Sequence, residues 1–344
     1  MLRSMLTLSV VLMHLLWACG DGSVDEELVP APDAETFEPD AEPDAEPEAV
    51  AEAQTSFDFI VTEMNFYFPE GLAPTETEAP NPCGLAGNTD NTVYQPLGLE
   101  GLVVEGFDLD GAEGAEGMCA HSDYVGPDGQ TGIDFGFLHV MDMIRPARPG
   151  QTIETVLASA PSQGLIKVGI RITGVDSFEN DDEVELLVTT TADTPLLGTD
   201  GQIVPRSSVA VDNDPAFQSV FRGEIVDGVL TAGPADVAVG KVNLLVIQDR
   251  VVSLKDAMIR ATLTETSEGI YEVDSILGGW WVRDEMEEAI SRAILTIGAN
   301  NGELDCVLDS YMDHSTDGTT CDAMSMVFKV KAVSGFLTGL ETQE

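Results

Sequence analysis

Apolar and polar residues alternate along most of the chain from residue 165 onward. In the first of these segments, Ile166, Val168, Ile170 and Ile172 alternate with polar or small residues. Similar alternation occupies residues 183–192, 203–211, 217–226, 229–232, 237–248, 251–264 and 269–276. A period of two residues is typical of strands that bury one face, so these segments predict roughly seven or eight closely spaced strands.

Two further segments predict strands on either side of this region. Residues 56–68 alternate and are rich in aromatic side chains, and residues 324–333 form a final apolar run. The pair Asp227-Gly228, which stands between two apolar runs, is typical of a tight hairpin turn. Hairpins join antiparallel neighbours, so the pattern favours an antiparallel sheet.

Three segments have the period of a helix with one apolar face. They cover residues 133–144, 152–160 and 282–297, and Pro146 and Gly298 end the first and the last of them. The helices and strands together predict an α+β fold. It is mainly antiparallel β, a sandwich or β-roll of about eight or nine strands with a few flanking helices.

Residues 69–132 have little periodicity and are rich in Gly, Pro, Asn and Asp. Irregular segments of this length are uncommon inside compact domains. We therefore expect bound ions or a disulfide to order this part of the chain.

The first 19 residues have the features of a secretory signal. Arg3 supplies a positive start, and the apolar run at 6–17 is shorter than the roughly 20 residues of a membrane-spanning helix. The run ends in Leu16-Trp17-Ala18-Cys19, which resembles the lipobox of bacterial lipoproteins. An ordinary signal peptide with a chance cysteine, or a buried apolar segment, would share the run but not the lipid.

The lipobox resemblance implies that residues 1–18 are removed and that Cys19 receives a diacylglycerol and an N-terminal acyl chain. Two or more acyl chains anchor a protein stably to a membrane. Gly20 stands at the position where, in such lipoproteins, an aspartate is associated with inner-membrane retention. The resemblance thus implies an outer-membrane lipoprotein, and the acids that follow at Asp21 and Asp25 resemble signals for surface exposure.

The lipidated cysteine is followed by an acidic stalk, so that residues 19–54 form one anchoring region. Residues 20–54 contain 13 acids and no Lys or Arg, and Pro39, Pro43 and Pro47 recur every four residues. Proline and charge repulsion both favour an extended, solvated chain. In the polyproline conformation 35 residues reach on the order of 100 Å, which would hold a folded domain at 55–344 clear of the lipid.

The charge balance limits the partners of the protein. The chain has 61 Asp and Glu against 15 Lys and Arg, a formal net charge of −46. Such a surface repels a phosphate backbone and predicts that the protein does not bind nucleic acid. It suits divalent cations, high salt or simple solubility.

Four cysteines remain once Cys19 carries lipid. Cys83, Cys119, Cys306 and Cys321 can form disulfides in three ways, and an oxidising compartment permits them. Pairing of neighbours, Cys83 with Cys119 and Cys306 with Cys321, would enclose the two Asp/Gly-rich regions. Free thiols or a four-cysteine zinc site are the alternatives, although no CxxC spacing is present.

The segment "DHSTDG" is the most specific candidate for a calcium site. Asp313, Ser315 and Asp317 stand at alternate positions before Gly318, and Asp322 follows. This resembles the DxDxDG core of EF-hand-like and thrombospondin type 3-like loops, in which alternating oxygens wrap one Ca²⁺ ion. The copy departs from the pattern, because a serine replaces one acid and a methionine stands at the twelfth position.

Two further acidic segments are candidates for Ca²⁺. One contains Asp108 and Asp110, and the other contains Asp123, Asp128 and Asp134. The alternative is that Asp and Gly simply form turns in these segments.

Catalytic motifs are not evident. HExxH, GxSxG, P-loop and GxGxxG motifs do not occur. His121, Ser122 and Asp123 contain the residue types of a triad, but a triad is assembled by the fold rather than from chain neighbours. Trp280 and Trp281 suggest a sugar-stacking platform, although alternation along a strand would turn one of them into the core.

Together these observations predict a non-enzymatic binding or structural lipoprotein anchored in the outer membrane through its lipid, with a calcium-stabilised β-rich domain. The overall layout resembles uncharacterised cell-surface lipoproteins of Gram-negative bacteria. An extracellular glycan or protein is the expected class of ligand. The alternative is a secreted-type hydrolase that acts on polysaccharide and is tethered to the cell.

Overall fold

The computed structural model describes residues 56–72, 75–76, 79–80, 83, 93–94, 97–112, 118–119, 121–144, 157–244, 247–288 and 301–340. The chain divides into two units, Met1–Ala51 and Glu52–Glu344, and all described residues belong to the second. The predicted signal sequence, Cys19 and most of the predicted acidic stalk fall in the first unit, and the whole region 1–54 lies outside the described residues.

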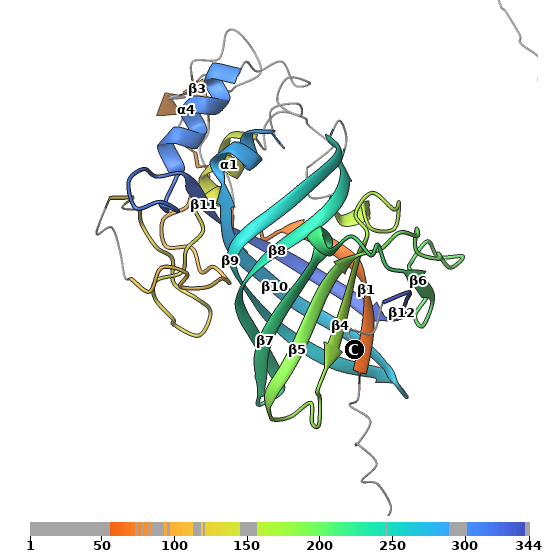
Figure 1. Cartoon of the computed structure of the whole chain (residues 1–344). Helices are drawn as coiled ribbons and strands as arrows, with labels where there is room; N and C mark the ends of the chain where they lie inside the picture. Colours follow the sequence, from red (N-terminus) through yellow and green to blue (C-terminus); the bar gives the residue numbers. More distant parts are fainter. Residues whose placement is uncertain are drawn as a thin grey trace, which may run out of the picture. The chain divides into compact units, whose positions relative to one another are not determined.

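Eight antiparallel strands close into a barrel (Figure 1). They are β1 (Ser56–Phe66), β4 (Val168–Thr173), β5 (Asp181–Thr190), β7 (Gln218–Val226), β8 (Val229–Leu244), β9 (Ile247–Ser267), β10 (Ile270–Val282) and β11 (Ala323–Ser334). Each strand pairs with the barrel strands that precede and follow it in sequence, and β1 pairs with β11 to complete the ring. The α+β, mainly antiparallel prediction is confirmed, but the expected sandwich or roll is replaced by a closed barrel.

Side chains fill the interior of the barrel. Large side chains from several strands, among them Phe59, Ile172, Leu186, Phe221 and Ile225, are at most 2% exposed. An eight-stranded barrel is just wide enough for its own side chains to fill it. The predicted hairpin at Asp227-Gly228 is present, with positive φ angles of 51° and 79° that such a tight turn requires.

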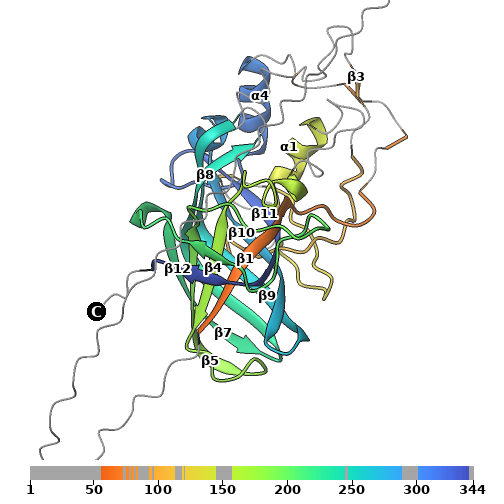
Figure 2. The same ribbon diagram turned by 90° about the vertical axis from the view of Figure 1, so that its right-hand side faces the viewer.

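The segment 203–211, predicted as a strand of the main sheet, lies outside the barrel. Within it β6 (Ser208–Ala210) is the strand, and it pairs in parallel with β12 (Phe336–Thr338), while Ile203 and Val211 form isolated bridges. Apolar side chains from both segments pack on Ile60 and Val333, which point outward from β1 and β11. The β12 strand crosses the outside of the barrel near β1 and β4 (Figure 2). An alternating pattern predicts that one face of a segment is buried, but it does not predict which part of the protein buries it.

Helices and short elements lie around the barrel. They are α1 (Phe137–Ile144), α4 (Asn301–Tyr311), the 3₁₀ turn Pro215–Phe217, and the two-residue strands β2 (Ala79–Pro80) and β3 (Val93–Tyr94). Both α1 and α4 lie near the end of the barrel where β11 begins (Figures 1 and 2).

The predicted helices are partly confirmed. The first begins at Phe137 rather than at residue 133, because Ile133 pairs instead with Tyr124. Residues 157–159 of the second and 283–288 of the third are helical, whereas Val282 is the last residue of β10. Residues 152–156 and 289–297 lie outside the described residues. The α4 helix was not predicted, since its sequence carries no clear apolar stripe.

Both disulfides form, but not between neighbours. Cys83 pairs with Cys306 and Cys119 with Cys321, over sequence separations of 223 and 202 residues. Closure of the barrel explains this pairing: β1 and β11 lie side by side, so the segment that follows β1 meets the segment that precedes β11. The expected pairing of Cys83 with Cys119 and of Cys306 with Cys321 is therefore wrong.

Candidate functional site

Residues 97–112, 118–119 and 121–135 are together called the loop segment, which packs on the outer face of the barrel at β10 and β11 (Figure 1). A Cβ atom at Gly278 of β10 would lie 2.6 Å from the Phe107 ring, and one at Gly106 would lie 3.5 Å from Val327 of β11. Glycine at these positions lets the loop segment approach the sheet closely. Successive residues of a strand alternate between its two faces. Trp281, three positions after Gly278, therefore points inward, whereas Gly278 faces the loop segment.

Backbone hydrogen bonds give the loop segment a defined shape. Tyr124 and Ile133 exchange two of these bonds, with N–O distances of 2.9 and 3.1 Å, and the Asp134 N–H donates to the Phe107 carbonyl at 2.9 Å. These bonds place Asp134 between the 108–112 turn and His121. The acids that stand far apart in the sequence therefore meet in one place.

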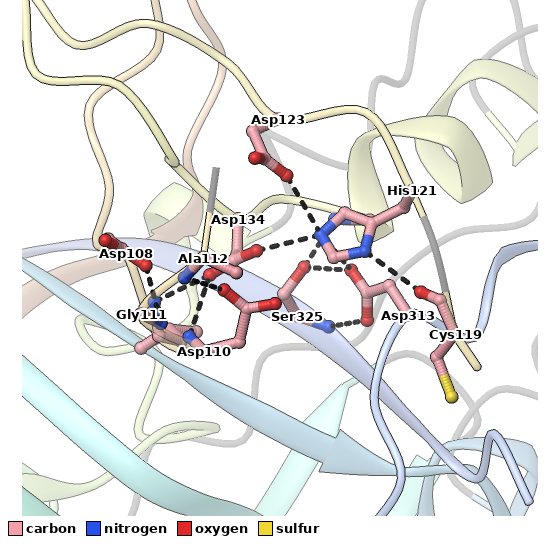
Figure 3. Close-up of polar contacts among 12 residues, drawn as sticks. Asp108, Asp110, Gly111, Ala112, Cys119, His121, Asp123, Asp134, Asp313 and Ser325 are labelled. Carbon is pink, nitrogen blue, oxygen red and sulfur yellow. Dashed lines mark hydrogen bonds and ion pairs between the residues drawn. The ribbon is translucent and has the colours of Figure 1, made fainter. Parts of the chain in front are cut away.

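His121 is the centre of the site (Figure 3). Its Nε2 atom lies 2.8 Å from Asp134 Oδ1, 3.4 Å from Asp123 Oδ1 and 3.9 Å from Asp313 Oδ2. Its Nδ1 atom donates to the Cys119 carbonyl oxygen at 3.2 Å. One imidazole nitrogen thus faces three carboxylates, and the backbone orients the other nitrogen.

Further hydrogen bonds hold the two buried carboxylates. The N–H groups of Leu109 and Asp110 donate to Asp134 Oδ2 at 2.6 and 3.3 Å. The Ser325 N–H donates to Asp313 Oδ1 at 2.7 Å, and its hydroxyl donates to Asp313 Oδ2. The network therefore joins the loop segment to β11 and to the residues after α4.

Burial and charge determine the protonation of the site. Burial alone would lower the pKa of His121, but the hydrogen bond to Asp134 and the charge of Asp313 raise it to about 9. Burial raises the pKa of Asp313 to about 6, against the lowering effect of Ser325 and His121. Burial likewise raises the pKa of Asp134. Each shift has the sign expected where negative charge is buried and positive charge is scarce.

Two sets of ligand atoms within this network lie close enough together to hold an ion. The ligand atoms of His121, Asp123 and Asp134 lie within 4.8 Å of one another, and so do those of Asp108, Asp110 and Asp134. Asp134 belongs to both sets. It is fully buried, whereas Asp108 and Asp110 are exposed.

The predicted pair Asp108 and Asp110 is brought together with Asp134. Gly111 has a φ angle of 72°, and its N–H donates to Asp108 Oδ1 at 2.8 Å. A Cβ atom at Gly132 would lie 2.9 Å from the Ala112 carbonyl oxygen and 3.2 Å from Asp108 Oδ2, so only glycine leaves these oxygens in place. Carboxylate oxygens of Asp108, Asp110 and Asp134 therefore lie together, with acids at alternate positions as expected for Ca²⁺.

The acids of the segment 313–322 are not brought together. Asp313 is buried against Ser325, whereas the exposed Asp317 accepts from the N–H and hydroxyl of Thr319 at 2.7 and 2.6 Å. Because Asp313 is buried, it does not lie with the exposed turn that contains Asp317 and Thr319. The other members of the expected calcium loop likewise make local bonds: Ser315 donates to Asp317, and Asp322 accepts from Thr316.

The third predicted set of calcium ligands, Asp123, Asp128 and Asp134, does not come together as a whole. Asp123 and Asp134 both approach His121, but Asp128 is exposed and accepts from the Gln130 N–H at 3.1 Å within a turn. Asp128 is in neither of the two ligand sets. It serves as a turn residue, which was the alternative expectation for these acids.

The structure does not place the two tryptophans or the residues of the possible triad as a sugar-stacking platform or a catalytic triad would require. Trp280 and Trp281 are 1% and 4% exposed, so neither offers a sugar-stacking surface. Trp280 stacks on His314 with ring centroids 4.1 Å apart. Ser122 is exposed, whereas His121 turns toward carboxylates. Sequence reasoning missed Ser325 altogether, and nothing in the apolar run at 324–333 distinguishes it.

No protein-family model matches the chain, and no match was found among curated proteins or solved structures. None of the helices in the described ranges has the length and apolar composition that a bilayer crossing requires.

Proposed function

We propose that this protein is a lipid-anchored lipoprotein of the outer membrane whose folded unit is a non-enzymatic binding or structural module stabilised by calcium. The observation that carries the proposal is the way the polar groups of the site are used. Both oxygens of Asp134 and of Asp313 accept hydrogen bonds from the protein itself. Groups engaged in this way hold segments of a fold in place, and they support a rigid module that presents its loops.

The disulfides and the filled barrel support the same proposal. Disulfides persist in oxidising compartments outside the cytoplasm, where a lipidated Cys19 would place the folded unit. An interior filled by its own side chains leaves the outer surface and loops as the regions for ligand contact. An extracellular glycan or protein is the ligand class that we propose.

Replacement of the anchor cysteine tests the membrane part of the proposal. Cys19→Ser should abolish incorporation of a palmitate analogue and release the protein from the outer-membrane fraction of a Gram-negative host. Trp17→Val is the matched control, because this position is permissive in the lipobox, and it should leave labelling intact. Membrane retention of the Cys19→Ser variant would contradict the proposed anchor.

Calcium titration tests the stabilising ion at Asp108, Asp110 and Asp134. After removal of ions with EDTA, Ca²⁺ at millimolar concentration should raise the melting temperature of the full-length protein, because a ligand that binds only the folded state stabilises it. The double variant Asp108→Asn/Asp110→Asn should lose this rise. Asp128→Asn, which changes an exposed aspartate of the same loop segment, should keep it. A rise that is equal in all three proteins would exclude this site.

A polysaccharide panel separates the binding module from the tethered hydrolase. The purified protein is retarded in gels that contain its ligand, and the same mixtures are assayed for new reducing ends. Retardation without new reducing ends supports a binding module. Release of reducing ends that depends on the protein would replace our proposal with the hydrolase.

A further inference from the structure

The orientation of His121 points to a second kind of ion site. The Cys119 carbonyl can only accept a hydrogen bond, so the Nδ1 atom of His121 carries a hydrogen and donates it at 3.2 Å. This bond turns Nε2 toward Asp123, Asp134 and Asp313. Histidines that bind metal usually donate their other ring N–H to a carbonyl or carboxylate in this manner.

The charge of the cluster supports a cation at this place. The side chains of Asp134 and Asp313 are 0% and 1% exposed, and His121 is the one cationic partner that they have among the described residues. With Asp123, three carboxylates surround one imidazole. Buried charges are stable when they are paired or coordinate a metal.

We propose that His121, Asp123 and Asp134 form a site for a divalent transition metal of the zinc class, with Asp313 beside it. Zinc lies about 2.0–2.2 Å from nitrogen and oxygen ligands, so neighbouring ligand atoms of a tetrahedral site are about 3.4 Å apart. The Nε2 atom of His121 lies 3.4 Å from Asp123 Oδ1, which equals this spacing, and 2.8 Å from Asp134 Oδ1, which is shorter. The imidazole nitrogen favours such a metal over calcium.

The surroundings give this site support and access. Leu109 and Asp110 hold the Oδ2 atom of Asp134, which leaves its Oδ1 atom turned toward His121. Ser325 holds Asp313 by two bonds, and Gly136 donates to the Ser325 hydroxyl at 2.6 Å. The side chains of His121 and Asp123 are 18% and 10% exposed, so an ion can enter from their side. The zinc site does not require calcium at Asp108 and Asp110, although Asp134 belongs to both ligand sets.

Zinc binding to the full-length protein tests the proposal. After treatment with EDTA and its removal, Zn²⁺ should bind with a stoichiometry of one in isothermal titration calorimetry. Loss of partners outside the ligand set typically costs 10–100-fold in metal affinity, so His121→Gln should weaken zinc binding by roughly 100-fold or more. The matched control His314→Gln removes a histidine that stacks on Trp280 instead, and it should bind zinc as the wild type does.

A measurement on the wild type keeps the test independent of variant folding. The zinc absorption-edge spectrum of the complex should show imidazole and oxygen scattering without sulfur. Equal zinc affinity of the His121→Gln variant, no binding by the wild type, or a ligand shell without imidazole would overturn the proposal. Calcium stabilisation that depends on Asp108 and Asp110 would be unaffected by any of these results, so the two sites fail separately.

Discussion

His121 shows how burial changes the chemistry of a residue whose sequence context is unremarkable. Its neighbours Ser122 and Asp123 suggest a weak triad, but the fold sets its ring against Asp134 and Asp313, which are 13 and 192 positions away. The functional meaning of this residue therefore depends on contacts over long sequence separations. The same is true of Ser325, which supports Asp313 from inside a strand.

Ser325→Ala should destabilise the protein. Ser325 is fully buried, and the variant leaves the Gly136 N–H and one oxygen of Asp313 without their partner. A buried polar group left unpaired costs roughly 1–3 kcal/mol, which urea unfolding can measure. Ser315→Ala removes a hydroxyl that donates to the exposed Asp317, and we expect a change within about 0.5 kcal/mol. Equal effects of the two variants would contradict the role of the network.

The stability of the metal-free protein should fall as the pH rises through about 9. The pKa of His121 is raised from 6.5 to about 9 in the fold, so folding takes up protons in this range. The contribution of His121 to the free energy of unfolding is fully present below pH 6.5 and is lost as the pH rises through about 9. Urea unfolding in EDTA from pH 6 to 9.5 should show this fall in the wild type and a flatter profile in His121→Gln. Parallel profiles of the two proteins would refute the assignment.

Among the elements, the contact between the loop segment and the barrel depends on the closure of β1 against β11. This closure brings the chain after β1 next to the chain before β11, and both disulfides form there. The Cys119–Cys321 bond also holds the carbonyl that orients His121. The disulfide and the polar network thus stabilise the same contact.

The double variant Cys119→Ala/Cys321→Ala should lower the free energy of unfolding by about 2–5 kcal/mol, because the bond closes a long loop in the unfolded chain. Urea unfolding of the oxidised proteins measures the loss. Cys19→Ser, which removes a cysteine that belongs to neither of these two disulfides, is the control and should unfold like the wild type. A double variant as stable as the wild type would show that the network alone holds the loop segment.

For the molecule as a whole, the net charge of −46 is the dominant electrostatic property. A surface with so much charge of one sign repels itself and opposes the compact state. Salt shortens the range of this repulsion from about 10 Å at 0.1 M to about 3 Å at 1 M. Screening of this repulsion by salt should therefore stabilise the folded state, in addition to any contribution from salt bridges or bound calcium.

The melting temperature should rise when NaCl is increased from 0.1 to 1 M. The measurement is made in EDTA, so that traces of divalent ions do not contribute, and sucrose at equal osmolality is the control for general exclusion effects. Screening predicts a larger rise with NaCl than with sucrose. An equal or smaller rise with NaCl would mean that self-repulsion does not limit the stability of this fold.

Properties that depend on local pattern could be predicted from the amino-acid sequence. Alternation of apolar residues predicted most of the barrel strands, the Asp227-Gly228 pair predicted a hairpin, and the cysteines predicted disulfides. These features follow from contacts within a few residues, or from residue type alone. The lipid anchor and calcium remain predictions that rest on such local patterns.

The closure of the sheet, the pairing of the cysteines and the meeting of the acids could not be predicted in this way, because they depend on contacts between distant segments. A strand pattern shows that one face is buried, but it does not show whether the first strand pairs with the last or whether a segment such as 203–211 packs outside the ring. Asp313 reaches His121 and Asp134 because closure and the disulfides bring distant segments together, whereas backbone hydrogen bonds within the loop segment bring Asp108 and Asp110 to Asp134. Such contacts depend on the path of the whole chain, which no short stretch of residues contains.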